Sequence, residues 1–198
     1  MSEPVSPEDR EVVARQLGRS PRALVAVAHR CPCGQPDVVE TSPRLEDGTP
    51  FPTLYYLTCP RASAAASRLE SAGRMREWQD ELATDPELAE GYRAAHEAYL
   101  ATRNVRDVLP TRATAGGMPD RVKCLHALAG HALAAGPGVN PIGDRAVEGM
   151  GEWWAKGPCA RPDARATSER ASQGAPATEE RNEGGVEPSQ GCSGEAGA

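Results

Sequence analysis

The sequence predicts an α+β fold: a small three-stranded antiparallel meander flanked by helices, followed by a disordered C-terminal tail. Three observations support this prediction. Short segments rich in Val, Tyr and Thr follow one another between residues 23 and 58, as the strands of a meander do. Helical patterns with capping and proline start signals surround these segments. The end of the chain is almost free of large apolar side chains.

The C-terminal segment, residues 160–198, contains a single large apolar side chain, that of Val186. Such a segment cannot bury enough apolar surface to offset the entropy lost when it becomes ordered. The sequence therefore predicts one folded domain over residues 1–159 and a disordered acidic tail over residues 160–198.

The predicted domain begins with a short helix and continues into the meander. Ser6 can cap this helix, Pro7 suits its first position, and Gly18 can end it. The connections between the strands contain Pro and Gly, which favour turns, and the simplest arrangement is up-down-up. The three strands are predicted over residues 23–29, 37–41 and 53–58.

The remainder of the domain is predicted to be helical. Gly73 separates the first two of these helices, and Asp85-Pro86 starts the third. After a loop, Pro119 opens a helix that carries no charged side chain in its second half and is therefore expected to be buried. The helices are predicted over residues 61–72, 74–83, 86 onward, 119–135 and 144–156.

Charge and hydropathy exclude several classes of protein. The formal net charge of −6 argues against nucleic-acid binding, which requires a basic surface. No apolar stretch reaches the roughly 20 residues that a membrane span needs. The start of the chain is acidic and lacks the apolar core of a secretory signal. We therefore expect a cytoplasmic protein without nucleic-acid or membrane partners, in which the six cysteines stay reduced.

Three cysteines are predicted to meet at one edge of the sheet. The first and third strands run in the same direction, so Cys31 and Cys33 after the first strand lie at the same edge as Cys59 after the third. The outer strands of such a meander are roughly 10 Å apart. Tetrahedral zinc, with Zn–S bonds of about 2.3 Å, can gather thiolates over this span. The sequence therefore predicts a zinc site that contains these three cysteines.

The fourth zinc ligand must come from another part of the chain. Cys124 and His126 lie in the helix predicted from residue 119, where their side chains would point about 200° apart and could not share a metal. We predict Cys124 as the fourth ligand, with His29 and Cys159 as weaker candidates. A site with four protein ligands has no open position, so this zinc would be structural.

The cysteines also permit two other interpretations. They could be small buried apolar side chains without chemistry. Alternatively, Cys59 or Cys124 is a nucleophile, with His126 or His131 as its acid–base group. Nearby cations lower the pKa of a thiol and attract anions, which suggests a basic rim that binds an anionic, perhaps phosphorylated, small molecule or a protein partner. The cations within three residues of these cysteines are Arg30, Arg61, Arg121 and Lys123.

A third interpretation is a non-catalytic interaction module. Trp78, Tyr92 and Tyr99 recur on the predicted helices and would form its binding face. The sequence leaves the zinc protein, the thiol- or His-dependent enzyme and the interaction module as open alternatives.

Several motifs resemble those of the actinobacterial family catalogued as domain of unknown function 501. The resemblance covers about residues 10–150 and implies a cytoplasmic setting. Genes of this family commonly neighbour those of a septum-formation initiator and an exopolyphosphatase-like enzyme, which implies a link to cell division or polyphosphate. The motifs are Arg30-Cys-Pro-Cys-Gly34, the segment from Pro43 to Pro60, the segment from Gly117 to His126, and Asn140-Pro-Ile-Gly-Asp144.

Overall fold

The computed structural model describes residues 2–160, so the predicted tail beyond residue 160 lies outside the described residues. Within them the α+β class is confirmed: helices accompany one antiparallel sheet with the strand order β1-β2-β3-β4. The strands are β1 Glu3–Pro4, β2 Leu24–Arg30, β3 Pro36–Thr41 and β4 Tyr55–Leu57. The helices are α1 Pro7–Leu17, α2 Pro60–Ser71, α3 Arg74–Thr84, α4 Pro86–Arg106, α5 Leu125–Ala135 and α6 Pro141–Met150.

The sheet has one strand more than the predicted three. β2, β3 and β4 form the expected meander, and β1 adds an edge strand that pairs antiparallel with β2 through Glu3 opposite Val27 and Pro4 opposite Ala26. Two residues are too short for an alternating pattern to be detected in the sequence. A proline is tolerated there because an edge strand leaves one row of backbone groups unpaired.

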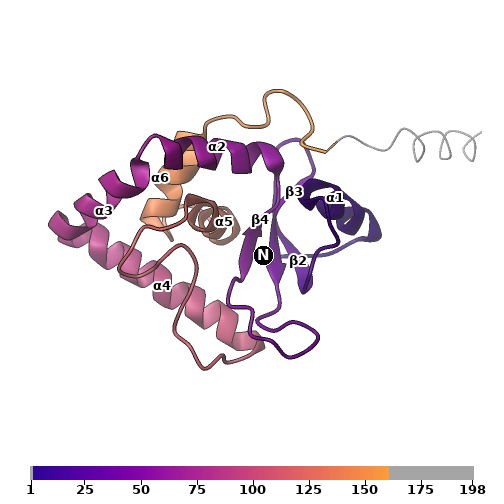
Figure 1. The fold of residues 1–198 in the computed structure, drawn as a ribbon, viewed down its shortest axis with the longest axis horizontal. Coiled ribbons are helices and arrows are strands. Elements are labelled where there is room, and N and C mark those ends of the chain that lie inside the picture. The colour runs from indigo at the N-terminus through magenta and orange to yellow at the C-terminus, as the bar shows by residue number, and fades with distance from the viewer. Residues whose placement is uncertain (1, 161–198) are drawn as a thin grey trace, which may run out of the picture. The chain divides into compact units, whose positions relative to one another are not determined.

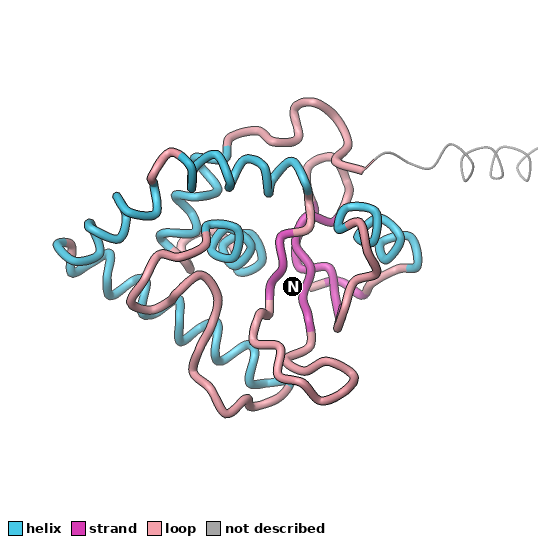
Figure 2. Tube along the Cα trace, in the orientation of Figure 1, coloured by secondary structure: helices cyan, strands magenta, loops and turns pink. Residues whose placement is uncertain are grey.

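Helices cover both faces of the sheet (Figure 1). α5 packs against β2, β3 and β4, and α1 contacts β3 from the other side. α2 and α6 pack on α5, and α3 and α4 follow them outward (Figure 2). A long loop over residues 107–124 joins α4 to α5 (Figure 2). None of the helices between residues 2 and 160 combines the length and apolar character needed to cross a membrane.

A buried aromatic cluster joins α5 to the sheet and to α4. The ring of His131 stacks on Tyr55, with 5.8 Å between centroids, and meets Tyr99 edge to face at 5.2 Å. Nδ2 of Asn140 donates to Nδ1 of His131 over 3.1 Å. Burial lowers the pKa of His131 to about 4, so it is a neutral core side chain rather than an acid–base group at the surface.

The prediction that Pro119 opens a helix is wrong. The backbone amides of Arg121 and Lys123 donate to the carbonyls of Gly117 and Gly116, so residues 116–120 form turns and residues 121–124 an irregular segment. α5 begins only at Leu125. A sequence pattern cannot detect this shift, because the competing hydrogen bonds come from a preceding loop.

The last helix also differs from its prediction. It begins at Pro141, where Oδ1 of the N-cap Asn140 accepts a hydrogen bond from the amide of Gly143, and it ends at Met150. Gly151 then adopts a φ of 62°, which a glycine tolerates and which stops the helix. The chain after it, through Trp153 and Trp154, forms turns.

Candidate functional site

A tight turn after β2 presents Cys31 and Cys33 at the end of the sheet. The amide of Cys31 donates to the carbonyl of Gln35 over 2.9 Å, and the amide of Gly34 donates to the carbonyl of Cys31 over 2.8 Å. Gly34 has a φ of 83°, a conformation that favours glycine. The turn also directs the backbone amide of Cys33 toward the thiol of Cys31.

Cys59 lies at the N-cap of α2, directly after β4. Its side chain is fully buried, and its Sγ accepts a hydrogen bond from the amide of Ala62 over 3.5 Å. Both the amide and the positive end of a helix dipole stabilise a thiolate. A side-chain hydrogen bond with Cys159 lowers the pKa of Cys59 below its usual value, although burial opposes this shift.

Cys159 joins these three cysteines from the far end of the described chain. Its Sγ lies 3.8 Å from Sγ of Cys33 and accepts a hydrogen bond from Nε2 of Gln16 over 3.3 Å. The side chain of Arg61 donates to the carbonyl of Gly157, which braces this segment against α2. We call Cys31, Cys33, Cys59 and Cys159 the four-cysteine cluster.

The thiols of the four-cysteine cluster form a chain of three pairwise contacts. Cys31 interacts with Cys33, Cys33 with Cys159, and Cys159 with Cys59. The hydrogen bond to Cys59, together with burial, raises the pKa of Cys159, and burial raises the pKa of Cys31 to about 12. Cys31 and Cys159 therefore keep their protons at neutral pH when no metal is bound, and a bound cation would release them.

Cys124 occupies a different centre, which we call the Cys124 triad: Glu70, Cys124 and His126. Sγ of Cys124 lies 4.0 Å from Nδ1 of His126, and Oε1 of Glu70 lies 3.1 Å from the same nitrogen. One ligand atom from each residue lies within 4.8 Å of the others, so the triad could also hold a metal ion, and among residues 2–160 it is the one group of three such residues that close together. Nε2 of His126 contacts Oγ of Ser67 over 3.2 Å.

The prediction that Cys124 and His126 cannot share a metal site is wrong. The two residues do not both lie inside a helix, because Cys124 is the N-cap of α5 with an extended backbone, at φ −152° and ψ 106°. The thiol therefore points back toward His126 in the first turn. Glu70, which no local pattern marks, completes the site from α2 by accepting a hydrogen bond from the amide of Leu125 over 2.7 Å.

The electrostatics of the triad favour a thiolate beside an imidazolium. The hydrogen bond with His126 lowers the pKa of Cys124, although burial opposes the shift. Cys124 and Glu70 together raise the pKa of His126 to about 9. Opposite shifts on two touching groups are typical of an ion pair.

The triad opens onto a cleft of about 680 Å³. Cys124 and His126 line one end of it, and Gln16, Leu17 and Tyr56 line other parts. A volume of this size lies in the range of small-molecule sites, about 300–1,000 Å³. Cys124 is half-buried, so it is accessible from the cleft, whereas Cys59 is not exposed.

The four cations of the predicted rim have different surroundings. Arg30 forms ion pairs with Asp9 and Glu3, and the nitrogen–oxygen distance is 2.8 Å in both. Arg121 and Lys123 are exposed. Arg61 is engaged with a backbone carbonyl, as described above. Anion binding at this rim stays a prediction, for which Arg121 and Lys123 are the cations least engaged by neighbours.

Two further sequence candidates have structural roles. His29, a weaker ligand candidate, contacts Asp37 through Nδ1 at 2.7 Å. Trp78, Tyr92 and Tyr99 are buried in the core, with at most 8% exposed, so the predicted interaction face around them is wrong. Aromatic side chains at helical spacing share one face of a helix, and that face can point to the core or to the surface. Tertiary packing decides between the two.

The fold and these two centres define a small α+β protein with a thiol-rich edge. The chain belongs to the family described as "Protein of unknown function (DUF501)", whose model matches residues 27–148. The match includes Cys31, Cys33, Cys59 and the whole Cys124 triad, and it ends before Cys159. Comparisons with curated proteins and with solved structures gave no match.

Proposed function

We propose that this is a zinc protein in which the four-cysteine cluster binds one structural Zn²⁺. The observation that carries the proposal is the 3.8 Å distance between the sulfur atoms of Cys33 and Cys159, two residues from opposite ends of the domain. Tetrahedral zinc with Zn–S bonds of about 2.3 Å separates its sulfur ligands by about 3.8 Å, so this pair already has the ligand spacing. No three of the four sulfurs, all of them in described residues, lie within 4.8 Å of one another, so the metal would draw the other two inward. Four thiolates complete the coordination and leave no position for a substrate.

The surroundings of the cluster support this proposal. Thiolates bound to zinc retain negative charge, and amide donors reduce the cost of burying it. Such donors are directed at three of the four sulfurs: the amide of Cys33 at Cys31, the amide of Ala62 at Cys59, and Nε2 of Gln16 at Cys159. The metal would tie the turn after β2, the start of α2 and the segment after α6 to one point.

Elemental analysis tests the proposal. Protein purified without added metal is expected to contain about one zinc per chain. Cys159→Ser is expected to lose this zinc, whereas Cys124→Ser and Cys192→Ser keep it, because they leave the cluster intact. Wild-type protein without zinc, or loss of zinc from Cys124→Ser with retention in Cys159→Ser, would contradict the proposal.

The Cys124 triad supports a second candidate function, that of a thiol-dependent enzyme. We favour thiol chemistry over a second metal there because Oε1 of Glu70 already accepts from Leu125 and contacts Nδ1 of His126. In the proposed reaction, the sulfur of Cys124 bonds to an acyl or phosphoryl group while the bond to the leaving group breaks. His126 gives its proton to the leaving group. Water then cleaves the new bond, and its proton returns to His126.

Alkylation kinetics test this second candidate. At pH 7, Cys124 of the zinc-loaded protein is expected to react with iodoacetamide about tenfold faster than the thiol of glutathione, because a lowered pKa leaves more thiolate. His126→Gln removes the cation that lowers this pKa. The rate at pH 7 should then fall about tenfold, and the rise of rate with pH should move to higher pH.

The control for this experiment is His29→Gln, which removes a histidine outside the triad. It is expected to leave the rate unchanged. A Cys124 that reacts no faster than glutathione, or a rate that His126→Gln does not alter, would overturn the enzyme interpretation and leave the zinc proposal unaffected.

A further inference from the structure

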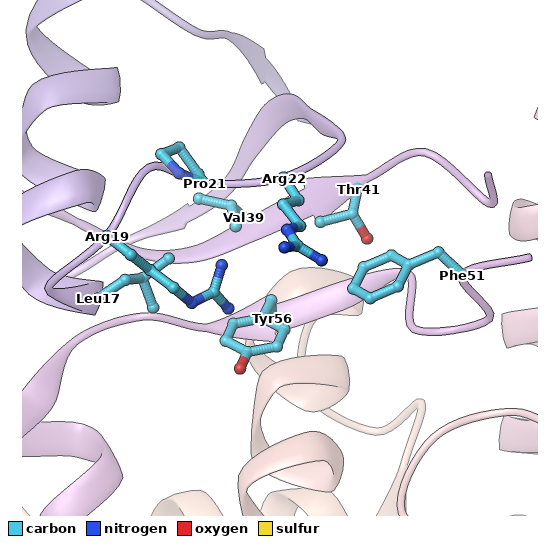
Figure 3. A pocket seen from close by; sticks show the side chains of 8 residues that line it. All are labelled: Leu17, Arg19, Pro21, Arg22, Val39, Thr41, Phe51 and Tyr56. Atoms are coloured by element: carbon cyan, nitrogen blue, oxygen red, sulfur yellow. The ribbon is translucent and has the colours of Figure 1, made fainter. Parts of the chain in front are cut away.

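A second cleft, of about 350 Å³, opens beside the start of β2. Arg19 and Arg22 enter it from the segment between α1 and β2, and Phe51 and Tyr56 enter it from the region of β4. Figure 3 shows both guanidinium groups pointing into the cleft toward the ring of Tyr56. We call this the arginine cleft.

The two cations of the arginine cleft have few protein partners. Among residues 2–160, no acidic side chain lines the cleft. Arg19 donates a long hydrogen bond of 3.4 Å to the carbonyl of Ser20. Hydrogen bonds from Thr49 are the main cause of the lowered pKa of Asp47, and the charge of Arg22 contributes least to it. Arg22 is therefore not strongly paired with this carboxylate.

On their other side, Arg19 and Arg22 line a separate cleft together with Glu46 and Asp47. No ion pair between these arginines and those carboxylates is found in the described part of the chain, so the guanidinium donors that face the arginine cleft can bind an external anion.

The backbone beside Arg22 is held in an unusual conformation. Ala23 has a φ of 51°, and it is the one residue other than glycine with a positive φ among the described residues. A side chain makes this conformation energetically unfavourable. The amide of Ser42 donates to the carbonyl of Ala23 over 2.7 Å, which holds the strained residue against the sheet. Residues in such conformations cluster at functional sites, and this one directly follows Arg22.

The arginine cleft and the cleft of the Cys124 triad are neighbours. Leu17 and Tyr56 line both clefts, so these two side chains stand between them. Cations and aromatic rings therefore line one cleft, and a thiol and an imidazole line its neighbour.

We propose that the arginine cleft binds a small phosphate ester that carries a planar ring. Two guanidinium groups balance the double charge of a phosphate and match its oxygen atoms with their forked donors. The ring would pack against Phe51 or Tyr56, which stand at the same cleft. Binding in this cleft stands on its own, whereas transfer of a group from the same ligand to Cys124 rests on the second proposed function.

Calorimetry with phenyl phosphate tests the proposal on the full chain. Wild-type protein is expected to bind phenyl phosphate in a saturable manner and more tightly than inorganic phosphate. Arg19→Gln and Arg22→Gln are each expected to weaken binding at least about tenfold, the effect of losing one charge-assisted hydrogen bond. Phe51→Leu should weaken binding of phenyl phosphate and leave inorganic phosphate unchanged.

Arg76→Gln is the matched control, because it removes an exposed arginine from α3. It is expected to change affinity less than twofold, and circular dichroism confirms that each variant is folded. Non-saturable binding, or an equal loss in Arg76→Gln and Arg22→Gln, would overturn the proposal. Cys124→Ser should bind phenyl phosphate like wild type, so a failure of the thiol chemistry and a failure of this cleft give different results.

Discussion

Replacing Cys59 by serine is expected to lower the free energy of unfolding by about 4 kcal/mol when free zinc exceeds its Kd a thousandfold. A metal that binds only the folded chain stabilises it by this amount, and the variant loses that binding. Cys59 has the most buried side chain of the four, so the change removes the ligand that water can least replace. Urea denaturation at a fixed free zinc concentration measures the difference.

Chelation separates loss of the metal from loss of the thiol. Wild-type protein stripped of zinc should fall close to the stability of Cys59→Ser, and the variant itself should not respond to the chelator. Cys124→Ser should respond like wild type, because its thiol lies outside the cluster. A wild-type protein whose stability is the same with and without zinc would contradict a structural role for the metal.

Replacing Gly143 by alanine is expected to destabilise the domain by about 3 kcal/mol, as overpacking of a core does. A Cβ at this position of α6 would lie 2.4 Å from the carbonyl oxygen of Leu128 and 2.8 Å from Cβ of Ala132, both in α5. Two helix backbones cannot move apart there without disturbing α5, whose first turn carries His126. Thermal or urea denaturation measures the loss.

Gly149→Ala provides the control from the same helix. Its Cβ would meet only the flexible end of Leu69, at 3.1 Å, and alanine gains about 1 kcal/mol of helix propensity. The variant is therefore expected to stay within about 1 kcal/mol of wild type. If Gly149→Ala were as damaging as Gly143→Ala, the close approach of α5 and α6 would not be the cause.

The location of three cysteines could be predicted because the direction of strands in a meander is fixed by their order. Cys31 and Cys59 follow β2 and β4, and these strands run the same way. The fourth member of the cluster, Cys159, could not be predicted in this way. It lies in a segment without helical or strand periodicity, and contacts with Gln16 and Arg61 from distant elements position that segment.

The Cys124 triad shows a different limit of sequence reasoning. Whether Cys124 and His126 face each other depends on whether the helix begins before or after residue 124. A start at Pro119 separates the two side chains, and a start at Leu125 brings them together. Helix ends depend on capping partners, and here the partner is Glu70, which is distant in sequence.

The most direct test of the account is zinc K-edge X-ray absorption spectroscopy on the zinc-loaded chain. The four-cysteine cluster predicts four sulfur neighbours at about 2.3 Å from the metal and no nitrogen or oxygen in the first coordination sphere. A spectrum with one sulfur and the nitrogen and oxygen neighbours expected from Cys124, His126 and Glu70 would place the metal at the triad and contradict the account.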